Sequence, residues 1–230
     1  MKPIITVTRL QFTYPDGTEA LDGVDFSLYP GETVVLLGAN GSGKTTFVLH
    51  LNGILRGQGD IVVCGLSLND KTIAEIRRKI GMVFQDADDQ LFMPAVLDDV
   101  AFGPSVNGAE PEEAIRRAKI ALERLGITTG LDRSPHHLSA GEKKRVAIAG
   151  VVACDPEILV LDEPTTFLDP PARRSLAFTL RGLPQAKILI THDTHFASAV
   201  ADRAVFFKAG KIVAEGPVAD LVNEFDWSGI

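Results

Sequence analysis

A glycine-rich loop that directly follows a short apolar run limits what this chain can fold into more than any other feature. The run covers residues 33–37 and predicts a buried strand, and Lys44 and Thr45 follow the loop at the start of a predicted helix. Glycines let successive backbone N–H groups turn inward, and the helix points its positive dipole end at the same place. The sequence therefore predicts a strand, loop and helix that together cradle the phosphates of a nucleotide.

Two side chains of this motif carry distinct chemistry. We expect Lys44 to place a positive charge against the β- and γ-phosphates, and Thr45 to offer its hydroxyl to Mg²⁺, which the phosphates also help to hold. An accidental glycine-rich turn is the alternative, but the strand before the loop and the helix after it count against that interpretation. The predicted nucleotide contacts are Gly38, Ala39, Asn40, Gly41, Ser42, Gly43, Lys44, Thr45 and Thr46.

A second apolar run, residues 158–161, ends in the carboxylates of Asp162 and Glu163. In a parallel sheet, functional side chains gather at such strand ends. Asp162 is placed to orient Mg²⁺ and its waters, and Glu163 can reach an attacking water. The alternative is that these acids only cap the next helix. Together with the loop, they supply the charge neutralisation, positioning and water activation that phosphoryl transfer requires.

A third motif, residues 138–145, lies between the first two and resembles the signature motif of the ATP-binding cassette ATPases. Ser139 is predicted to be the N-cap of a helix that runs to Cys154, and with Gly141 it forms a helix N-terminus able to meet an anion. Further residues follow in the order that this family requires, so the resemblance spans nearly the whole chain. They are Tyr14, Gln85, Asp169 and His192.

The resemblance implies a role for several of these residues. Tyr14 would stack on adenine, Gln85 would contact Mg²⁺ and relay to a membrane partner, and His192 would bond the γ-phosphate. The implied catalytic residues are Lys44, Gln85, Glu163 and His192. The implied Mg²⁺ site, completed by ATP, consists of Thr45, Gln85 and Asp162.

The resemblance also implies a second ATPase subunit, either identical or different. In this family the signature helix cannot reach the phosphates of its own chain, so Ser139 and Gly141 of one subunit would close over ATP on the other. The chain departs from the family pattern at Ala140, Glu142 and Phe167. Gly141 remains, so the phosphate-facing turn should survive, whereas the bulky Phe167 ring must find room at the subunit boundary.

The order of the predicted elements indicates an α/β fold in a single ATPase domain, residues 1–230. Short strands up to about residue 31 predict an N-terminal antiparallel β subdomain beside a parallel-sheet core that holds the glycine-rich loop. A helical subdomain is expected as an insertion at about residues 86–153. One of its helices should begin at Pro111 and stop at Gly126, with a buried stripe of Ile115, Ala118, Leu122 and Leu125.

Composition disfavours several classes of protein. With 230 residues and a net charge of −7, the chain can bury a full core and lacks the basic, aromatic-rich runs of a nucleic-acid surface. No stretch reaches the ~18 apolar residues of a membrane span, and the N-terminus lacks the pattern of a signal peptide. Cys64 and Cys154 are predicted to be reduced core residues. Two basic clusters, residues 77–79 and 143–145, are predicted to be solvated helix faces.

The stretch of residues 85–104 resembles the same stretch in the ATPases of energy-coupling-factor importers, particularly those for cobalt and nickel. Leu91, Phe92 and Met93 are predicted to form an apolar groove beside Gln85 that receives a helix of a membrane protein. The alternative is that the apolar side chains of this stretch simply belong to the core of the helical subdomain.

We therefore expect an ATPase that energises an importer of this type, for cobalt or another divalent metal ion. It would bind integral membrane subunits at the cytoplasmic face of the cell membrane as a peripheral protein, and it would bind no nucleic acid. Two alternatives stay open: the same role for a vitamin such as biotin, and a soluble ATPase outside transport. Soluble cassettes usually pair two cassettes in one chain or insert a long coiled coil, which this sequence lacks. A GTP-binding switch is disfavoured because the sequence has no Asn-Lys-x-Asp motif.

Overall fold

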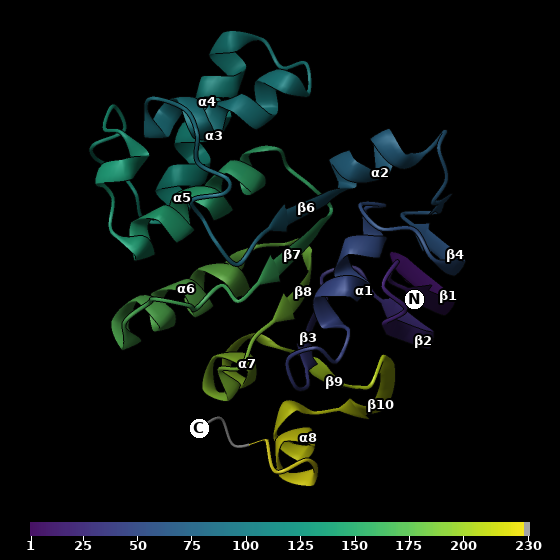
Figure 1. Cartoon of the computed structure of the whole chain (residues 1–230). Helices are drawn as coiled ribbons and strands as arrows, with labels where there is room; N and C mark the ends of the chain where they lie inside the picture. The colour runs from purple at the N-terminus through teal and green to yellow at the C-terminus, as the bar shows by residue number, and fades with distance from the viewer. Residues whose placement is uncertain (228–230) are drawn as a thin grey trace.

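Two β-sheets with different strand arrangements form the framework of the molecule (Figure 1). The computed structural model describes residues 1–227, so the predicted domain end at residue 230 lies outside the described range. The smaller sheet is antiparallel, in the order β2-β1-β4-β5. Its strands are β1 (Ile5–Thr13), β2 (Glu19–Leu28), β4 (Gln58–Val63) and β5 (Leu66–Ser67). This sheet confirms the predicted antiparallel unit, to which β4 and β5 add residues from beyond the glycine-rich loop.

The larger sheet contains the parallel core. Its order is β10-β9-β3-β8-β7-β6, and all neighbours are parallel except β10 and β9. The strands are β3 (Thr33–Leu37), β6 (Ile80–Val83), β7 (Ile158–Asp162), β8 (Ala186–Ile190), β9 (Arg203–Lys208) and β10 (Lys211–Gly216). The predicted α/β fold class is therefore confirmed.

The side chains of the central strands point alternately into two separate cores. In β3, Val35 and Leu37 join the cluster that contains the buried residues of the helices α3–α8, whereas Val34 and Leu36 join the cluster shared with the smaller sheet and with Phe47 of α1. Successive side chains of a strand face opposite sides of a sheet. Because both sides are covered, residues 33–37 are apolar throughout rather than alternating.

Parallel strands bring their carboxyl ends to one edge of the larger sheet. Leu36 of β3 pairs with Ile190 of β8, and Leu161 of β7 pairs with Leu189 of β8 and Val83 of β6. The segments that leave these strands are the glycine-rich loop, the acidic pair at residues 162–163, and the stretches around residues 85 and 192. All of them start from the same edge, which is where ligands bind in sheets of this kind.

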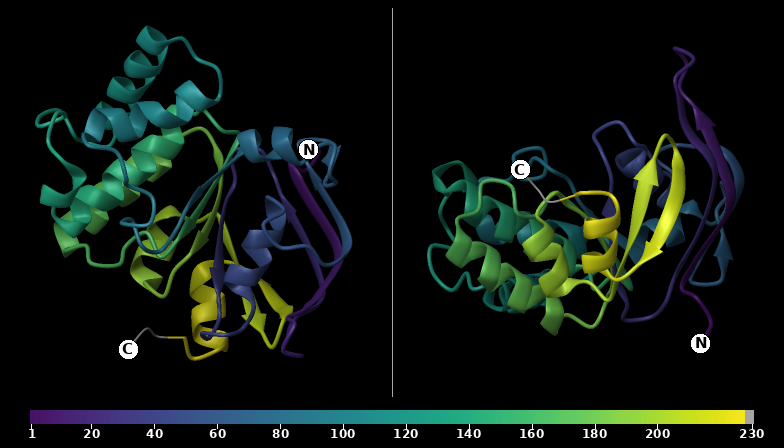
Figure 2. Two further views of the ribbon diagram at one scale, coloured as in Figure 1. Left: turned by 45° about the horizontal axis from the view of Figure 1, so that its top comes forward. Right: turned by 90° about the horizontal axis from the view of Figure 1, so that it is seen from below.

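The helices fall into two groups. One group follows or flanks the strands: α1 (Lys44–Leu51), α2 (Ile73–Lys79), α6 (Pro170–Gly182), α7 (Thr194–Val200) and α8 (Val218–Glu224). The other group lies between β6 and β7 in the sequence: α3 (Val96–Val106), α4 (Pro111–Arg124), the 3₁₀ turn η1 (Pro135–His137) and α5 (Ala140–Ala153). Helices α3, α4 and α5 pack on one another at the side of the molecule away from β1 and β2 (Figure 2).

The buried stripe of α4 differs from the predicted one at a single position. Ala118 and Leu122 are buried as predicted, but Ile115 is 41% exposed, and Ala114 and Ala121 are buried in its place. Small alanine side chains let α4 approach α3 and α5 closely, which turns the larger Ile115 toward solvent. Leu125 is buried and Gly126 follows it with a φ of +74°, which confirms the predicted end of the helix.

The cysteines and one basic cluster also depart from expectation. Cys64 and Cys154 are free thiols, as predicted, but both are half-buried rather than fully inside the core. Burial is the main cause that raises the pKa of Cys64 to about 12. In the first basic cluster, Arg77 donates to the carbonyl of Asn52 at 3.1 Å and the Lys79 ammonium lies 2.7 Å from a carboxylate oxygen of Glu157, so these side chains are not simply solvated.

Among residues 1–227, no helix has both the length and the apolar character to span a membrane.

Candidate functional site

A cleft of about 610 Å³ opens at the carboxyl edge of the larger sheet. It brings together residues that are as far apart in the sequence as Tyr14 and His192. The predicted site residues that line it are Tyr14, Asn40, Gly41, Gly43, Lys44, Thr45, Thr46, Gln85, Asp162, Glu163 and His192. Gly38, Ala39 and Ser42 lie in the same loop but do not line the cleft, and neither do Ser139 and Gly141.

The loop that forms one wall of the cleft requires glycine at particular positions. Gly43 has a φ of +106°, and a Cβ atom there would lie 2.5 Å from the carbonyl oxygen of Ala20. At Gly38, with a φ of +132°, a Cβ atom would collide with the carbonyl of Phe207. At these two positions the loop therefore runs too close to neighbouring backbone for a side chain, and α1 begins directly behind the loop at Lys44.

Lys44 is buried, and the loop holds its ammonium group in place. Its Nζ donates to the carbonyl oxygens of Gly38 at 2.7 Å and of Ala39 at 2.9 Å. Burial lowers the pKa of Lys44, and the charges of Glu163 and Asp162 oppose that shift. Because an ammonium group has three donors, these two bonds leave one N–H that can reach a ligand in the cleft.

The two carboxylates at the end of β7 have different surroundings. Asp162 accepts a hydrogen bond of 3.1 Å from the hydroxyl of Thr45, which places two oxygen ligands side by side at the start of α1. Glu163 has a φ of +46°, and its N–H donates to the carbonyl of Ile190 at 2.8 Å. Its Oε1 is buried without a hydrogen-bond partner among the described residues. Burial is the main cause that raises the pKa of both carboxyls.

Helix capping does not explain this acidic pair. The N-cap of α6 is Asp169, whose carboxylate accepts from the N–H of Ala172 at 2.8 Å. Asp162 and Glu163 cap no helix in the described chain. Glu163 instead lines the cleft, and its unpartnered oxygen could be satisfied by a polar ligand such as water.

His192 and Gln85 complete the polar rim of the cleft. The Nε2 atom of His192 lies 3.0 Å from Oδ1 of Asn40 and 3.4 Å from Oε1 of Glu163. Gln85 follows β6, and its exposed side chain also lines the cleft. A ligand bound to the glycine-rich loop would therefore have His192 and Glu163 close to one end.

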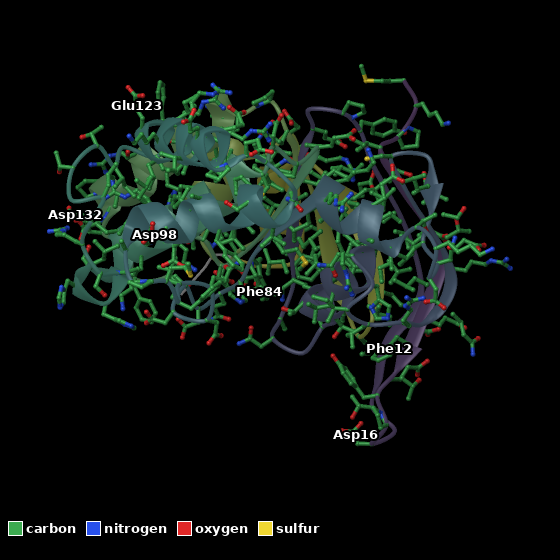
Figure 3. All side chains as sticks on the ribbon, turned by 90° about the horizontal axis from the view of Figure 1, so that it is seen from above. Phe12, Asp16, Phe84, Asp98, Glu123 and Asp132 are labelled. Carbon is green, nitrogen blue, oxygen red and sulfur yellow. The ribbon has the colours of Figure 1, made fainter. Side chains whose placement is uncertain are left out.

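Tyr14 lines the cleft next to Thr46 of α1. Its hydroxyl lies 3.0 Å from the hydroxyl of Thr46, and its ring meets Phe12 edge-on at a centroid distance of 4.9 Å. The turn between β1 and β2, with Asp16 at its tip, stands away from the body of the molecule beyond Phe12 (Figure 3). The ring is half-buried, so it can offer a surface to a flat ligand.

The signature helix starts as predicted, but Ser139 and Gly141 at its N-terminus do not line the cleft of their own chain. Ser139 caps α5 by accepting from the N–H of Glu142 at 3.3 Å, and a carboxylate oxygen of Glu142 accepts from the N–H of Ser139 at 2.9 Å. This reciprocal capping box explains how Glu142 can replace the usual Gln. Ser139 is exposed, and so is Phe167, which has a φ of +65°.

Lys144 is buried beside the segment that carries Gln85, which the sequence did not predict. It was expected on a solvated face, but it is only 2% exposed, and its Nζ donates to the carbonyls of Gln85 at 2.5 Å and Phe84 at 3.2 Å. Burial lowers its pKa. The missed signal was the helical period, since Lys144 lies four residues before Ile148 on the buried face of α5. Lys143, by contrast, pairs with Asp88 at 2.6 Å.

A second hollow, an apolar groove of about 230 Å³, lies at the junction of the helical group with α2. Phe92 is 63% exposed and Phe102 is 41% exposed, and their rings meet edge-on at 5.1 Å. Leu91 lines the groove from a buried position. Leu91 and Phe92 therefore line an apolar groove as predicted, whereas Met93 does not line it and Gln85 does not lie beside it among the lining residues.

Comparison with protein families supports the resemblance seen in the sequence. The family model described as ABC transporter matches residues 21–166. A putative ABC transporter ATP-binding protein of Streptomyces coelicolor is 52% identical over 96% of this chain and 86% of its own length. The energy-coupling factor transporter ATP-binding protein EcfA of Carboxydothermus hydrogenoformans is 44% identical over 97% of this chain and 84% of its own length.

Solved structures show the same architecture. The chain resembles cbiO1 of Clostridium perfringens, described as part of the ABC transporter complex cbiONQ, with a TM-score of 0.88 and 38% identity over 98% of this chain and 93% of that one. It also resembles the dimeric ATP-binding cassette MJ0796 in a post-hydrolysis state with ADP and Pi, with a TM-score of 0.84 and 27% identity over 93% of this chain and 98% of that one.

Proposed function

Because the chain belongs to the ABC transporter family and is an ATPase of the kind found in energy-coupling-factor importers, we propose that it powers the uptake of cobalt or another divalent metal ion. ATP hydrolysis is supported by one observation above all. Four residues with the required chemistry line one cleft at the edge of the larger sheet: Lys44, Asp162, Glu163 and His192. The choice of a metal ion is supported by the resemblance of residues 85–104 to the corresponding stretch of cobalt and nickel importers. It is also consistent with the similarity to cbiO1.

ATP would lie with its phosphates on the glycine-rich loop and the start of α1. The free N–H of Lys44 and the backbone N–H groups of the loop would neutralise the phosphate charge. The hydroxyl of Thr45 and the carboxylate of Asp162 are hard oxygen ligands that already touch, so they fit Mg²⁺, with Gln85 as a further candidate ligand. When bound, Mg²⁺ supplies charge neutralisation at the β- and γ-phosphates.

The hydrolytic step is assigned to Glu163 and His192. The unpartnered Oε1 of Glu163 would accept a hydrogen bond from the attacking water and draw its proton away. A raised pKa makes Glu163 a stronger base than an ordinary carboxylate, provided that it is ionised when the water arrives. Nε2 of His192, 3.4 Å from that oxygen, would donate to the γ-phosphate and hold it in line.

We assign the closing surface of the site to a second ATPase subunit, identical or different. Ser139 and Gly141 do not line the cleft of their own chain, and the capped N-terminus of α5 is exposed there. Such a helix end suits a phosphate presented by another subunit. We further assign residues 86–153 to one inserted subdomain, because α3, α4 and α5 pack mainly on one another.

Replacing Tyr14 should affect nucleotide affinity more than catalysis. Adenine stacking is made equally in the ground and transition states, so Tyr14→Ala should lose about 1–3 kcal/mol of binding and raise KM more than it lowers kcat. Tyr14→Phe is the matched control, because it removes only the 3.0 Å contact with Thr46 and keeps the ring. Steady-state ATPase kinetics of both variants test this role, which a fall in kcat at constant KM for Tyr14→Ala would contradict.

The apolar groove is the surface that we assign to the membrane subunits. Phe92 and Phe102 offer exposed aromatic rings over a buried floor, an arrangement that suits one apolar face of a helix. Changing both to Ser should reduce the amount of co-purified membrane subunit by roughly tenfold, the effect expected when buried aromatic anchors are lost. ATP binding should stay at the wild-type level, because neither ring lines the cleft.

The matched control for the groove is Phe178→Ser. Phe178 lies on α6, is 84% exposed and does not line the groove, so its loss should leave the complex intact. An undiminished complex in the groove variant would reject the docking surface. An unfolded groove variant would show instead that Phe92 and Phe102 serve the core.

Uptake measurements test the proposed substrate. The chain would be co-expressed with the membrane subunits identified by mass spectrometry after purification, and the accumulation of labelled cobalt, nickel and biotin would be compared. ATP-dependent accumulation of a metal ion, lost in a Glu163→Gln strain, is the expected result. Accumulation of biotin alone would assign a vitamin importer, and the absence of any membrane subunit would favour a soluble ATPase. Protease access from each side of the membrane tests the assignment to the cytoplasmic face.

A further inference from the structure

His192 is held in the cleft by few contacts. Its side chain is 44% exposed, so burial does not fix the ring. Its polar neighbours are Asn40 in the glycine-rich loop and Glu163 at the end of β7, both of which line the cleft. A bound nucleotide and its attacking water would compete for these same neighbours. The remaining ring contact is with Trp227, whose indole lies 5.9 Å from the imidazole at an angle of 33°.

Trp227 is itself fixed by residues outside the cleft. Its backbone N–H donates to the carbonyl of Val222 at 2.8 Å, which folds the chain back after α8. The indole meets Phe206 edge-on at 5.5 Å, and the Phe206 ring stacks on Phe225 at 3.9 Å. Phe206 belongs to β9 and pairs with Leu37, the residue directly before the glycine-rich loop. Three aromatic rings thus connect α8 and the parallel sheet to His192.

We propose that Trp227 is a positioning residue that holds the imidazole of His192 in the orientation needed for hydrolysis. The contact lies within the range of centroid distances at which aromatic pairs attract each other. Trp227 does not line the cleft, so a bound nucleotide would not compete for this contact. This inference rests on the proposed role of His192 in catalysis.

Kinetics of the ATPase test the proposal. Trp227→Ala should lower kcat by roughly three- to tenfold, the range that an aromatic contact of this kind is worth, with little change in KM. Trp227→Phe should recover most of the loss, because it restores a flat ring at the same place. In a His192→Ala background, Trp227→Ala should not lower kcat further, because the effect of Trp227 on hydrolysis depends on the presence of His192. A purely structural role would give additive losses and a lower melting temperature in both backgrounds.

Fluorescence tests the contact without reference to activity. Trp227 is the single tryptophan of the chain, so all tryptophan emission comes from the residue that contacts His192. His192→Ala should change the emission of the nucleotide-free protein, whereas His195→Ala, an exposed histidine three residues later, should not. Equal emission in wild type and His192→Ala would overturn the proposal.

The ATPase rates of the two single variants distinguish the positioning role of Trp227 from the catalytic role of His192 on which it rests. If His192→Ala hydrolyses ATP at the wild-type rate, the catalytic role of His192 is rejected, and the positioning role with it. If His192→Ala is inactive and Trp227→Ala is as fast as wild type, the positioning role alone is rejected.

Discussion

Replacing Glu163 with glutamine is expected to slow ATP hydrolysis by roughly 10²–10⁴-fold, the contribution of a positioned general base, while ATP still binds. Glutamine keeps the size of the side chain but cannot take a proton from water. The effect should be large because Oε1 of Glu163 is buried, lies 3.4 Å from His192 and has no hydrogen-bond partner among the described residues. Single-turnover hydrolysis and nucleotide binding, measured separately, check the two halves of this prediction.

The same variant should also hold two subunits together. Unhydrolysed ATP would remain between the glycine-rich loop of one subunit and Ser139 and Gly141 of the other. Size-exclusion chromatography with Mg-ATP should therefore show more dimer for Glu163→Gln than for wild type. Glu157→Gln is the matched control, because Glu157 directly precedes the other end of the same strand, pairs with Lys79 and does not line the cleft. No increase in dimer for Glu163→Gln would count against a shared site.

Replacing Lys44 with alanine is expected to lower hydrolysis by roughly 10²-fold or more and to weaken ATP binding as well. Among residues 1–227, Lys44 is the only lysine that lines the cleft, so no neighbouring ammonium there can take over its contact with the phosphates. Removing it also frees the carbonyls of Gly38 and Ala39, which would then face the phosphate oxygens without a cation between them. Wild-type turnover in this variant would contradict the assignment of the nucleotide site.

Lys187→Ala separates this effect from the general cost of losing a buried lysine. Lys187 is also buried, and its Nζ donates to the carbonyls of Leu183 and Gln185, but it does not line the cleft. Its loss should lower the melting temperature without the loss of nucleotide affinity expected for Lys44→Ala. Calorimetry and nucleotide titration on both variants make the comparison.

Local sequence patterns predict much of the fold and of the candidate site. The run at residues 33–37, the glycines after it and the acids at residues 162–163 predict strands that end in functional loops, and parallel pairing then requires those loops to meet. Ser139 was predicted to cap α5 from its residue type and position, and the structure confirms it. These features depend on residues close together in the sequence.

Features that depend on packing between distant segments were not predictable in the same way. Ile115 is exposed because α4 packs through alanines. Whether residue 114 or residue 115 is buried depends on how closely α3 and α5 approach α4. The charge of Lys144 predicts a solvent-exposed side chain, yet backbone carbonyls 60 and 59 residues away in the sequence accept its hydrogen bonds. The contact of Trp227 with His192 joins a C-terminal segment to a cleft formed by earlier parts of the chain.

The hydrogen bonds of Lys144 have a mechanical consequence. An ammonium buried in the protein is costly to leave unpaired, so α5 cannot slide away from the carbonyls of Phe84 and Gln85 without stranding a charge in a poorly polar interior. A movement of α5 that keeps these hydrogen bonds requires residues 84–85 to move together with the helix. If α5 rotated so that Ser139 approached the nucleotide of another subunit, Gln85 would change its position in the cleft at the same time.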